Sequence, residues 1–265
     1  MDVAAPIRHA LFFADVHLDA REPARTERFV AFLDAAAREG YERAFCLGDL
    51  FHAWIGPRQA ESEEARPVLD ALARLARSGA RLTLFHGNRD FHLGEEMLRA
   101  TGADAVVPDA CTIALAHPDG RPRALYLAHG DLLCARDGAY RAMRRVIRSR
   151  PARRLYLSLP LGAASAIAGG MAGASRTVVA RKSQRTLSLA ASAVRRAFRR
   201  SGADAAVVGH VHRAGRTGLE VDGRRRLLFT LGSWEGDAAS YIVYRDGRFA
   251  LHDGPGGSAV LVEDL

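Results

Sequence analysis

Five apolar, strand-like runs in this chain each end in polar side chains of the kinds that bind metal ions. The endings lie at 15–17, 48–49, 87–90, 129–131 and 209–212, and four of the five contain a glycine. Amphipathic, helix-like segments separate the first three runs, which is the pattern of an α/β fold. Sites in α/β sheets form at the carboxyl ends of strands. We therefore expect the five endings to converge.

The remaining pattern of the chain agrees with an α/β class. Apolar residues at helical spacing predict helices at 22–40 and 61–79. The two strand-like runs 109–115 and 123–131 flank Asp119 and Gly120, which predicts a hairpin between them. The other runs that read as strands or β-rich segments are 9–17, 43–51, 80–91, 203–213, 225–234 and 240–251.

The polar endings supply oxygen and nitrogen donors and no sulfur. One bridging carboxylate would divide them into two sites of four ligands each, and mixed imidazole and carboxylate shells suit Mn, Fe or Zn. Alternation along a strand is expected to point Asp15 and His17 the same way, and likewise His210 and His212. A single histidine near a strand end is usually a satisfied buried group, but the ordered set predicts two divalent metal ions. The seven donors are Asp15, His17, Asp49, Asn88, His129, His210 and His212.

Positive charge is concentrated in the middle of the chain. The net charge is +8, from 38 basic and 30 acidic residues, and the excess lies at 140–154, 176–185 and 195–201. Such patches suit nucleic acid, anionic lipid or phosphorylated substrates, and the alternative is a solvated helix face. Proteins that bind single-stranded nucleic acid interleave aromatic and basic residues. Aromatic residues are sparse in these patches, so no nucleic-acid partner is expected.

An uncharged run of 21 residues, Leu155 to Ser175, lies inside the basic region. It is long enough to span a membrane but holds Pro160 and several glycines and serines. Two interpretations remain open: an interfacial or ligand-covering helical segment, or a helix pair buried on the body of the protein. Three scattered cysteines without CxxC spacing, and a start unlike a signal peptide, predict a cytoplasmic protein with reduced thiols.

The ordered motifs resemble those of the calcineurin-like metallophosphoesterases. The stretches FADVHL, LGDLFHAWIG, FHGNRDFHLG, HGDLLCARDGAY and GHVHR are similar to one branch, the UDP-2,3-diacylglucosamine pyrophosphohydrolases of lipid A synthesis. The similarity covers most of residues 10–235. It implies an α/β sandwich of two β-sheets flanked by helices, with a core at 1–136 and 201–265 and a helical lid insertion at 137–200. It also implies hydrolysis of UDP-2,3-diacylglucosamine to UMP and 2,3-diacylglucosamine 1-phosphate (lipid X).

The resemblance also implies roles for individual residues. One metal would be held by Asp15, His17, Asp49 and His212. The other would be held by Asp49, Asn88, His129 and His210, with Asp49 bridging. The implied catalytic residues are Asp49, Asn88, His129 and Arg89. The implied substrate contacts are Asn88, Arg89, Asp137, Ser175, Lys182 and His210. Lys182 is the only lysine in the chain, and Val179 stands where the family has an asparagine.

A mechanism follows as a hypothesis. Two metals, most simply Mn²⁺, would activate a water for attack on the α-phosphorus, while Arg89 and Lys182 offset phosphate charge. Many metallophosphoesterases have a histidine acid where Arg89 stands. Its absence favours a pyrophosphate substrate, whose leaving group departs as an anion. The basic lid predicts peripheral attachment to the anionic inner-membrane surface, and no obligate protein partner is inferred.

Two alternatives remain beside this function. Val179 motivates a related metallophosphoesterase that acts on another nucleotide diphosphate or pyrophosphate. A non-catalytic scaffold that has lost its metals is the other, and the complete set of seven donors argues against it.

Overall fold

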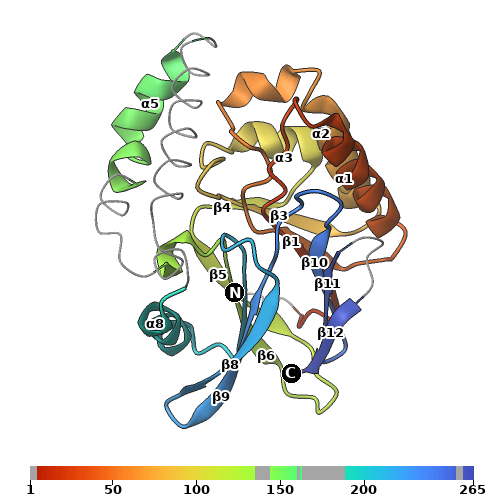
Figure 1. Ribbon diagram of the computed structural model, residues 1–265, viewed down its shortest axis with the longest axis vertical. Helices are drawn as coiled ribbons and strands as arrows, with labels where there is room; N and C mark the ends of the chain where they lie inside the picture. Colours follow the sequence, from red (N-terminus) through yellow and green to blue (C-terminus); the bar gives the residue numbers. More distant parts are fainter. Residues whose placement is uncertain (1–4, 135–143, 160–161, 163–188, 255–258) are drawn as a thin grey trace.

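A computed structural model describes residues 5–134, 144–159, 162, 189–254 and 259–265 (Figure 1). One sheet contains β1 (His9–Phe13), β2 (Arg43–Cys46), β3 (Arg81–Phe85), β4 (Ala105–Val107), β10 (Ser240–Arg245), β11 (Arg248–Asp253) and β12 (Ala259–Asp264). The other contains β5 (Ala110–Leu115), β6 (Arg123–Ala128), β7 (Ala205–Val208), β8 (Gly215–Val221) and β9 (Arg224–Thr230). The named helices are α1 (Pro23–Ala36), α2 (Arg66–Arg77), α3 (Glu95–Thr101), α5 (Arg150–Ser158) and α8 (Ala191–Ser201), with short 3₁₀ turns η1 (Pro57–Glu61) and η2 (Asp131–Leu133).

The order of the strands sets where their ends lie. The seven-stranded sheet runs β12-β11-β10-β1-β2-β3-β4, and the five-stranded sheet runs β5-β6-β7-β9-β8. Strands β1, β2, β3 and β4 are parallel neighbours, and so are β6, β7 and β9. Parallel neighbours end at the same edge of a sheet, so each sheet delivers several loops to one edge.

Strand β1 is apolar and buried from Ala10 to Phe13 because both of its faces are covered. Leu11 and Phe13 face the cluster that includes the helices, while Ala10 and Phe12 face the second sheet. A half-exposed strand would alternate apolar and polar residues, whereas a strand covered on both faces reads as a continuous apolar run. The apolar run ALFF at 10–13 is therefore the signature of a central strand.

Four layers follow from this arrangement. Helices α1, α2 and α3 pack on the outer face of the seven-stranded sheet, as Figure 1 shows. Side chains of both sheets fill the space between them. Helix α8 packs on the outer face of the five-stranded sheet, where Val194 and Phe198 meet Val208 and Leu228. Two sheets flanked by helices confirm the predicted α/β sandwich.

The hairpin predicted near Asp119 and Gly120 is confirmed, because β5 and β6 pair antiparallel with Ala110 opposite Ala128. The β-rich stretch 240–251 is a second hairpin, β10–β11. The sequence pattern did not predict β8 or β12. Strand β8 contains two glycines, an arginine and a glutamate, so it lacks the apolar content that marks a strand.

Part of the predicted insertion at 137–200 lies within the described residues, namely 144–149, α5 and most of α8. Asp137, Ser175, Val179 and Lys182 lie outside the described residues, as does most of the uncharged run. The boundaries of the insertion stay a prediction. Within the part of the chain that the structure describes, no helix has the length and apolar character needed to cross a membrane.

We predict that Phe12→Ala destabilises the fold by about 3–5 kcal/mol, the usual cost of removing a buried aromatic ring. Phe12 has no exposed surface, and its ring stacks on Phe45 at 5.2 Å between centroids. Urea unfolding measures the free energy. Val260→Ala, at a side chain 57% exposed, is the control and should change stability by less than about 0.5 kcal/mol. Equal effects of the two substitutions would contradict the sandwich core.

Candidate metal centre

The strand endings meet at one edge of the two sheets. Loops after β1, β2 and β3 come from the seven-stranded sheet, and loops after β6 and β7 come from the five-stranded sheet. Backbone hydrogen bonds join loops within each sheet, from Asp15 N–H to the Gly48 carbonyl at 3.1 Å and from Gly209 N–H to the His129 carbonyl at 2.8 Å. The His210 N–H donates to Asp15 Oδ2 at 2.7 Å and joins the two sheets. The convergence expected from the sequence is therefore present for all seven predicted donors.

Five of these donors have a left-handed backbone. The φ angles are 54° for Asp15, 52° for His17, 52° for Asp49, 70° for His210 and 52° for His212. Non-glycine residues rarely adopt this region, and each such residue costs of the order of 1–3 kcal/mol. Strand alternation was expected to direct the side chains of Asp15 and His17. This explanation is wrong, because β1 ends at Phe13 and both residues lie in the loop that follows it. Left-handed turns, not strand alternation, direct their side chains.

The first group of donors gathers around His17. Its Nε2 lies 3.0 Å from Nε2 of His212 and 3.9 Å from Oδ1 of Asp15. The distance from Asp15 Oδ1 to His212 Nε2 is 3.5 Å. Asp15 Oδ1 is buried and has no hydrogen bond to any described residue. An orphaned buried carboxylate oxygen beside two imidazole nitrogens fits a cation site.

The second group gathers around Asn88. Its Oδ1 lies 2.9 Å from His210 Nδ1 and 3.0 Å from His129 Nε2, and these two nitrogens are 3.2 Å apart. The other ring nitrogen of His129 lies 3.0 Å from the carbonyl of Leu47. A carbonyl only accepts, so the proton of a neutral His129 is on Nδ1 and the lone pair of Nε2 faces Asn88. Two acceptors that face each other fit a shared cation.

Asp49 lies between the two groups. Its Oδ2 is 3.9 Å from His17 Nε2 and 3.8 Å from His129 Nε2. Its Oδ1 accepts the backbone N–H of Arg89 at 2.9 Å. One carboxylate is thus near both sets of nitrogens, which is the position that a bridging ligand needs. The seven donors together fit two divalent cations, and Asp15, His17 and His212 also form one compact trio of ligand atoms.

Burial dominates the electrostatics of the centre. It raises the pKa of Asp49 to about 7 and lowers the pKa of His210 to about 4. Burial also opposes ionisation of Asp15, but the imidazole of His212, 3.5 Å from Oδ1, and the charges of the neighbouring histidines lower the pKa of Asp15 to about 2. A buried carboxylate such as Asp49 is costly to ionise alone, whereas a bound dication offsets its charge.

Asp90, whose role the sequence left open, fixes two of the loops. Its Oδ1 accepts the N–H groups of Gly87 at 2.8 Å and Asp49 at 3.2 Å, and its Oδ2 accepts that of Leu50 at 2.7 Å. The side chain is fully buried. One carboxylate therefore joins the loop after β2 to the loop after β3, which carry Asp49 and Asn88.

Gly87 allows the close approach of these two loops. A Cβ built on Gly87 would lie 2.0 Å from Asp49 Oδ1 and 2.3 Å from the Asp49 nitrogen. Both Asp49 atoms are held by hydrogen bonds, the nitrogen by Asp90 at 3.2 Å and Oδ1 by the Arg89 N–H at 2.9 Å. Any side chain at this position would displace Asp49 from its place between the histidines.

Several supporting residues were not predicted from the sequence. Arg25, in the first turn of α1, is buried and donates to the carbonyl of His17 at 3.1 Å. Trp54 donates its backbone N–H to the Arg89 carbonyl at 3.2 Å and its Nε1–H to Glu96 at 3.1 Å. An arginine in the first turn of a helix is usually solvated, so the sequence pattern does not mark Arg25 as a buried support.

Arg89 lies beside the donors without replacing any of them. Its Nε is 3.8 Å from Asp49 Oδ2, and its Nη1 is 3.4 Å from Nδ1 of His52. A partly exposed guanidinium at the rim of the cluster is suited to an anionic ligand. The substrate roles predicted for Asp137, Ser175 and Lys182 concern residues outside the described part of the chain.

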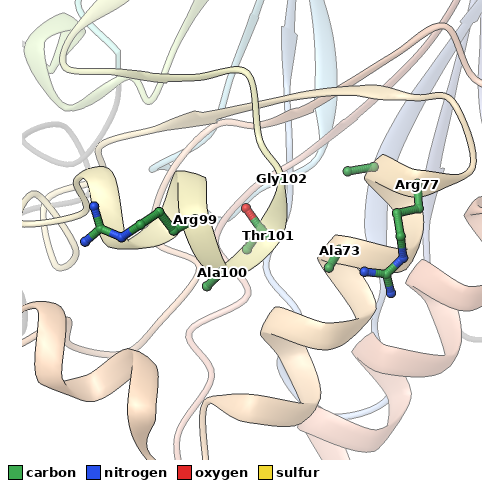
Figure 2. Close-up of a pocket in the computed structure, with 7 residues that line it drawn as sticks. Ala73, Arg77, Arg99, Ala100, Thr101 and Gly102 are labelled. Atoms are coloured by element: carbon green, nitrogen blue, oxygen red, sulfur yellow. The ribbon is translucent and has the colours of Figure 1, made fainter.

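A shallow pocket of about 290 Å³ lies elsewhere, between the end of α2 and the end of α3 (Figure 2). None of the predicted donors lines it. The lining residues are Ala73, Ala76, Arg77, Arg99, Ala100, Thr101 and Gly102.

Known proteins are similar to this chain in sequence and in fold. The sequence model of the calcineurin-like phosphoesterases matches residues 9–214. The chain is 36% identical over 225 residues to the UDP-2,3-diacylglucosamine hydrolase of Pseudomonas paraeruginosa, covering 85% of this chain and 90% of that protein. It is 35% identical over 244 residues to the protein of the same name from Aeromonas hydrophila, covering 91% and 96%. A dimetal phosphatase from Danio rerio shares the fold, with a TM-score of 0.52 at 12% identity over 98% of this chain and 99% of that chain.

We predict that Asp49 makes the stability of the metal-free protein depend on pH. Its folded pKa, about 7, exceeds the ordinary value of 3.8, so its contribution is present below pH 3.8 and is lost as the pH rises through about 7. Urea unfolding in a chelator should show wild-type stability falling relative to Asp49→Asn between about pH 4.5 and 8. A difference that is constant across this range would contradict the prediction.

Proposed function

The chain belongs to the calcineurin-like phosphoesterase family, and we propose that it hydrolyses UDP-2,3-diacylglucosamine to UMP and 2,3-diacylglucosamine 1-phosphate. Relatives named UDP-2,3-diacylglucosamine hydrolase match this chain over most of their length at about 35% identity. The protein is therefore a metal-dependent hydrolase. The observation that carries the proposal is the pairing of this similarity with a complete set of seven converging donors.

Two groups of residues would hold two divalent cations, for which we propose Mn²⁺. Asp15, His17 and His212 would hold one, and Asn88, His129 and His210 the other, with Asp49 shared. Bound cations of this kind polarise phosphoryl oxygens and lower the pKa of water. The protein keeps the donors oriented through the Leu47 carbonyl, the Asp90 carboxylate and the left-handed turns.

Arg89 is proposed to bind the phosphate oxygens of the substrate. Its backbone is fixed by two hydrogen bonds, the N–H to Asp49 and the carbonyl from Trp54. Its guanidinium can give two parallel N–H donors to one phosphate, which adds geometry as well as attraction. Because a sugar phosphate can leave as an anion, no protonating group is needed at this position. Lys182 and Asp137 are proposed as further substrate contacts.

We predict that the purified protein releases UMP from UDP-2,3-diacylglucosamine in the presence of Mn²⁺. Asp49→Ala and His129→Ala should reduce the rate by at least about 10³-fold, because each removes a donor from the centre. Arg89→Ala should retain metal binding but lose about 10²-fold in kcat/KM. Chromatographic detection of UMP measures the rate, and Val260→Ala is the matched control.

A second outcome would favour the alternative substrate class that Val179 suggests. Metal-loaded protein that leaves UDP-2,3-diacylglucosamine intact, while it cleaves other nucleotide diphosphates, would identify a related pyrophosphatase. Protein that cleaves neither, although it binds metal, would contradict the proposed function.

We also propose that the protein binds the cytoplasmic surface of the inner membrane through residues 144–158. Val146 is 65% exposed and Leu155 is 68% exposed, and Arg154 beside Leu155 is exposed as well. Exposed aliphatic side chains next to arginines suit the interface of an anionic bilayer, where each cation adds about 1 kcal/mol.

We predict that the protein floats with vesicles that contain anionic lipid. Val146→Ser with Leu155→Ser should release most of the protein, because the substitutions remove the exposed apolar surface and leave the charge unchanged. Val260→Ser with Val262→Ser is the matched control, since these two side chains are similarly exposed, at 57% and 58%, on the distant strand β12. Equal flotation of all three proteins would contradict the proposed surface.

A further inference from the structure

Arg148 joins the middle region of the chain to the loop that carries Asn88. Its Nη2–H donates to the Gly87 carbonyl at 2.7 Å, and its Nη1–H donates to the Pro108 carbonyl at 2.9 Å. The same Nη1 lies 3.5 Å from Asp109 Oδ1. The guanidinium also lies over the ring of Phe91, 5.4 Å from its centroid. One side chain thus braces the loop after β3 against the segment after β4.

The Gly87 contact is close to the proposed metal centre. Gly87 directly precedes Asn88, whose Oδ1 faces two histidines at 2.9 and 3.0 Å. Asp90 holds the N–H of Gly87 from the inner side, and Arg148 holds its carbonyl from the outer side. Gly87 lies so close to Asp49 that a Cβ built on it would be 2.0 Å from Asp49 Oδ1. Asp90 therefore holds the peptide group before the Gly87 Cα, and Arg148 holds the Gly87–Asn88 peptide group after it.

We propose that Arg148 is a positioning residue for the metal centre, and that it sets the Gly87–Asn88 peptide so that Asn88 Oδ1 faces His129 and His210. The inference rests on the proposed metal sites, and it adds to them a residue from outside the strand-end motifs. It links the order of the second donor group to the docking of residues 144–149 on the core.

An arginine is suited to this role and a lysine is not. The two carbonyl acceptors, on Gly87 and Pro108, are met by two different nitrogens of one planar guanidinium. A lysine ammonium is a point donor without this fixed fork, so it cannot reproduce the geometry. Lysine keeps the positive charge, which separates the loss of geometry from the loss of charge.

The neighbouring side chains provide controls for the experiment. Arg145 is exposed on the same turn of chain. Tyr156, on α5, stacks on His92 with ring centroids 4.4 Å apart, which is a second contact between the middle region and the core. Tyr156→Ala weakens this docking without removing a hydrogen bond to Gly87.

The test uses metal-stripped full-length protein and Mn²⁺ titrated by calorimetry, with no substrate. We expect Arg148→Ala and Arg148→Lys to lower the affinity for one of the two Mn²⁺ ions by about 10-fold or more. A loss of this size is typical when a residue that orients a metal ligand is removed. The other equivalent should bind as in the wild type, and Arg145→Ala and Tyr156→Ala should bind both equivalents as in the wild type. Thermal unfolding confirms that each variant is folded.

Amide hydrogen exchange gives a readout that needs no metal. Exchange in a peptide covering 85–92 should rise in Arg148→Ala and Arg148→Lys and stay at the wild-type level in Arg145→Ala. Wild-type exchange and Mn²⁺ affinity in both Arg148 variants would overturn the inference. An equal loss of affinity in Tyr156→Ala would also overturn it, because docking alone would then account for the effect. A wild-type protein that binds no Mn²⁺ would contradict the proposed function, while the exchange result would still decide the role of Arg148.

Discussion

The site depends on one buried carboxylate, that of Asp90, which is not itself one of the predicted metal ligands. Asp90 accepts three backbone N–H groups from two loops that the chain places about 40 residues apart. Those loops carry Asp49, which lies between the two donor groups, and Asn88, which belongs to the second group. Three hydrogen bonds to one buried side chain hold the two loops together as a unit. The positions of the remaining donors are set relative to this unit.

The left-handed turns at the donors show how the rest of the fold contributes. Five strained residues at one edge add up to several kcal/mol of unfavourable backbone energy, by the usual cost per residue. Packed layers on both sides of each sheet supply the opposing stabilisation. Residues such as Arg25, which holds the carbonyl of His17, keep the strained turns in place. The conformation of the donors is therefore a property of the whole sandwich.

The donors and the α/β class could be predicted from the sequence, because both leave local signals. Apolar runs that end in Asp, Asn or His mark the edge of a sheet, and an ordered set of five such endings is rare by chance. The partners of Asp90, Arg25 and Arg148 leave no such signal. Each of these three side chains makes hydrogen bonds to backbone groups of another segment. Backbone N–H and carbonyl groups occur in nearly every residue type, so the sequence does not reveal which ones are bound. Strand β8 was also missed, because its pairing with β9, not its apolar content, makes it a strand.

The two sheets contribute donors from both halves of the chain, with His17 and His212 separated by 195 positions. A cation held by these two residues would act as a reversible cross-link across nearly the whole polymer. In the unfolded chain, closing a loop of that length costs roughly 5 kcal/mol of entropy, comparable with a long-range disulfide. Metal supply would then govern how long the protein persists in the cell, as well as how fast it works.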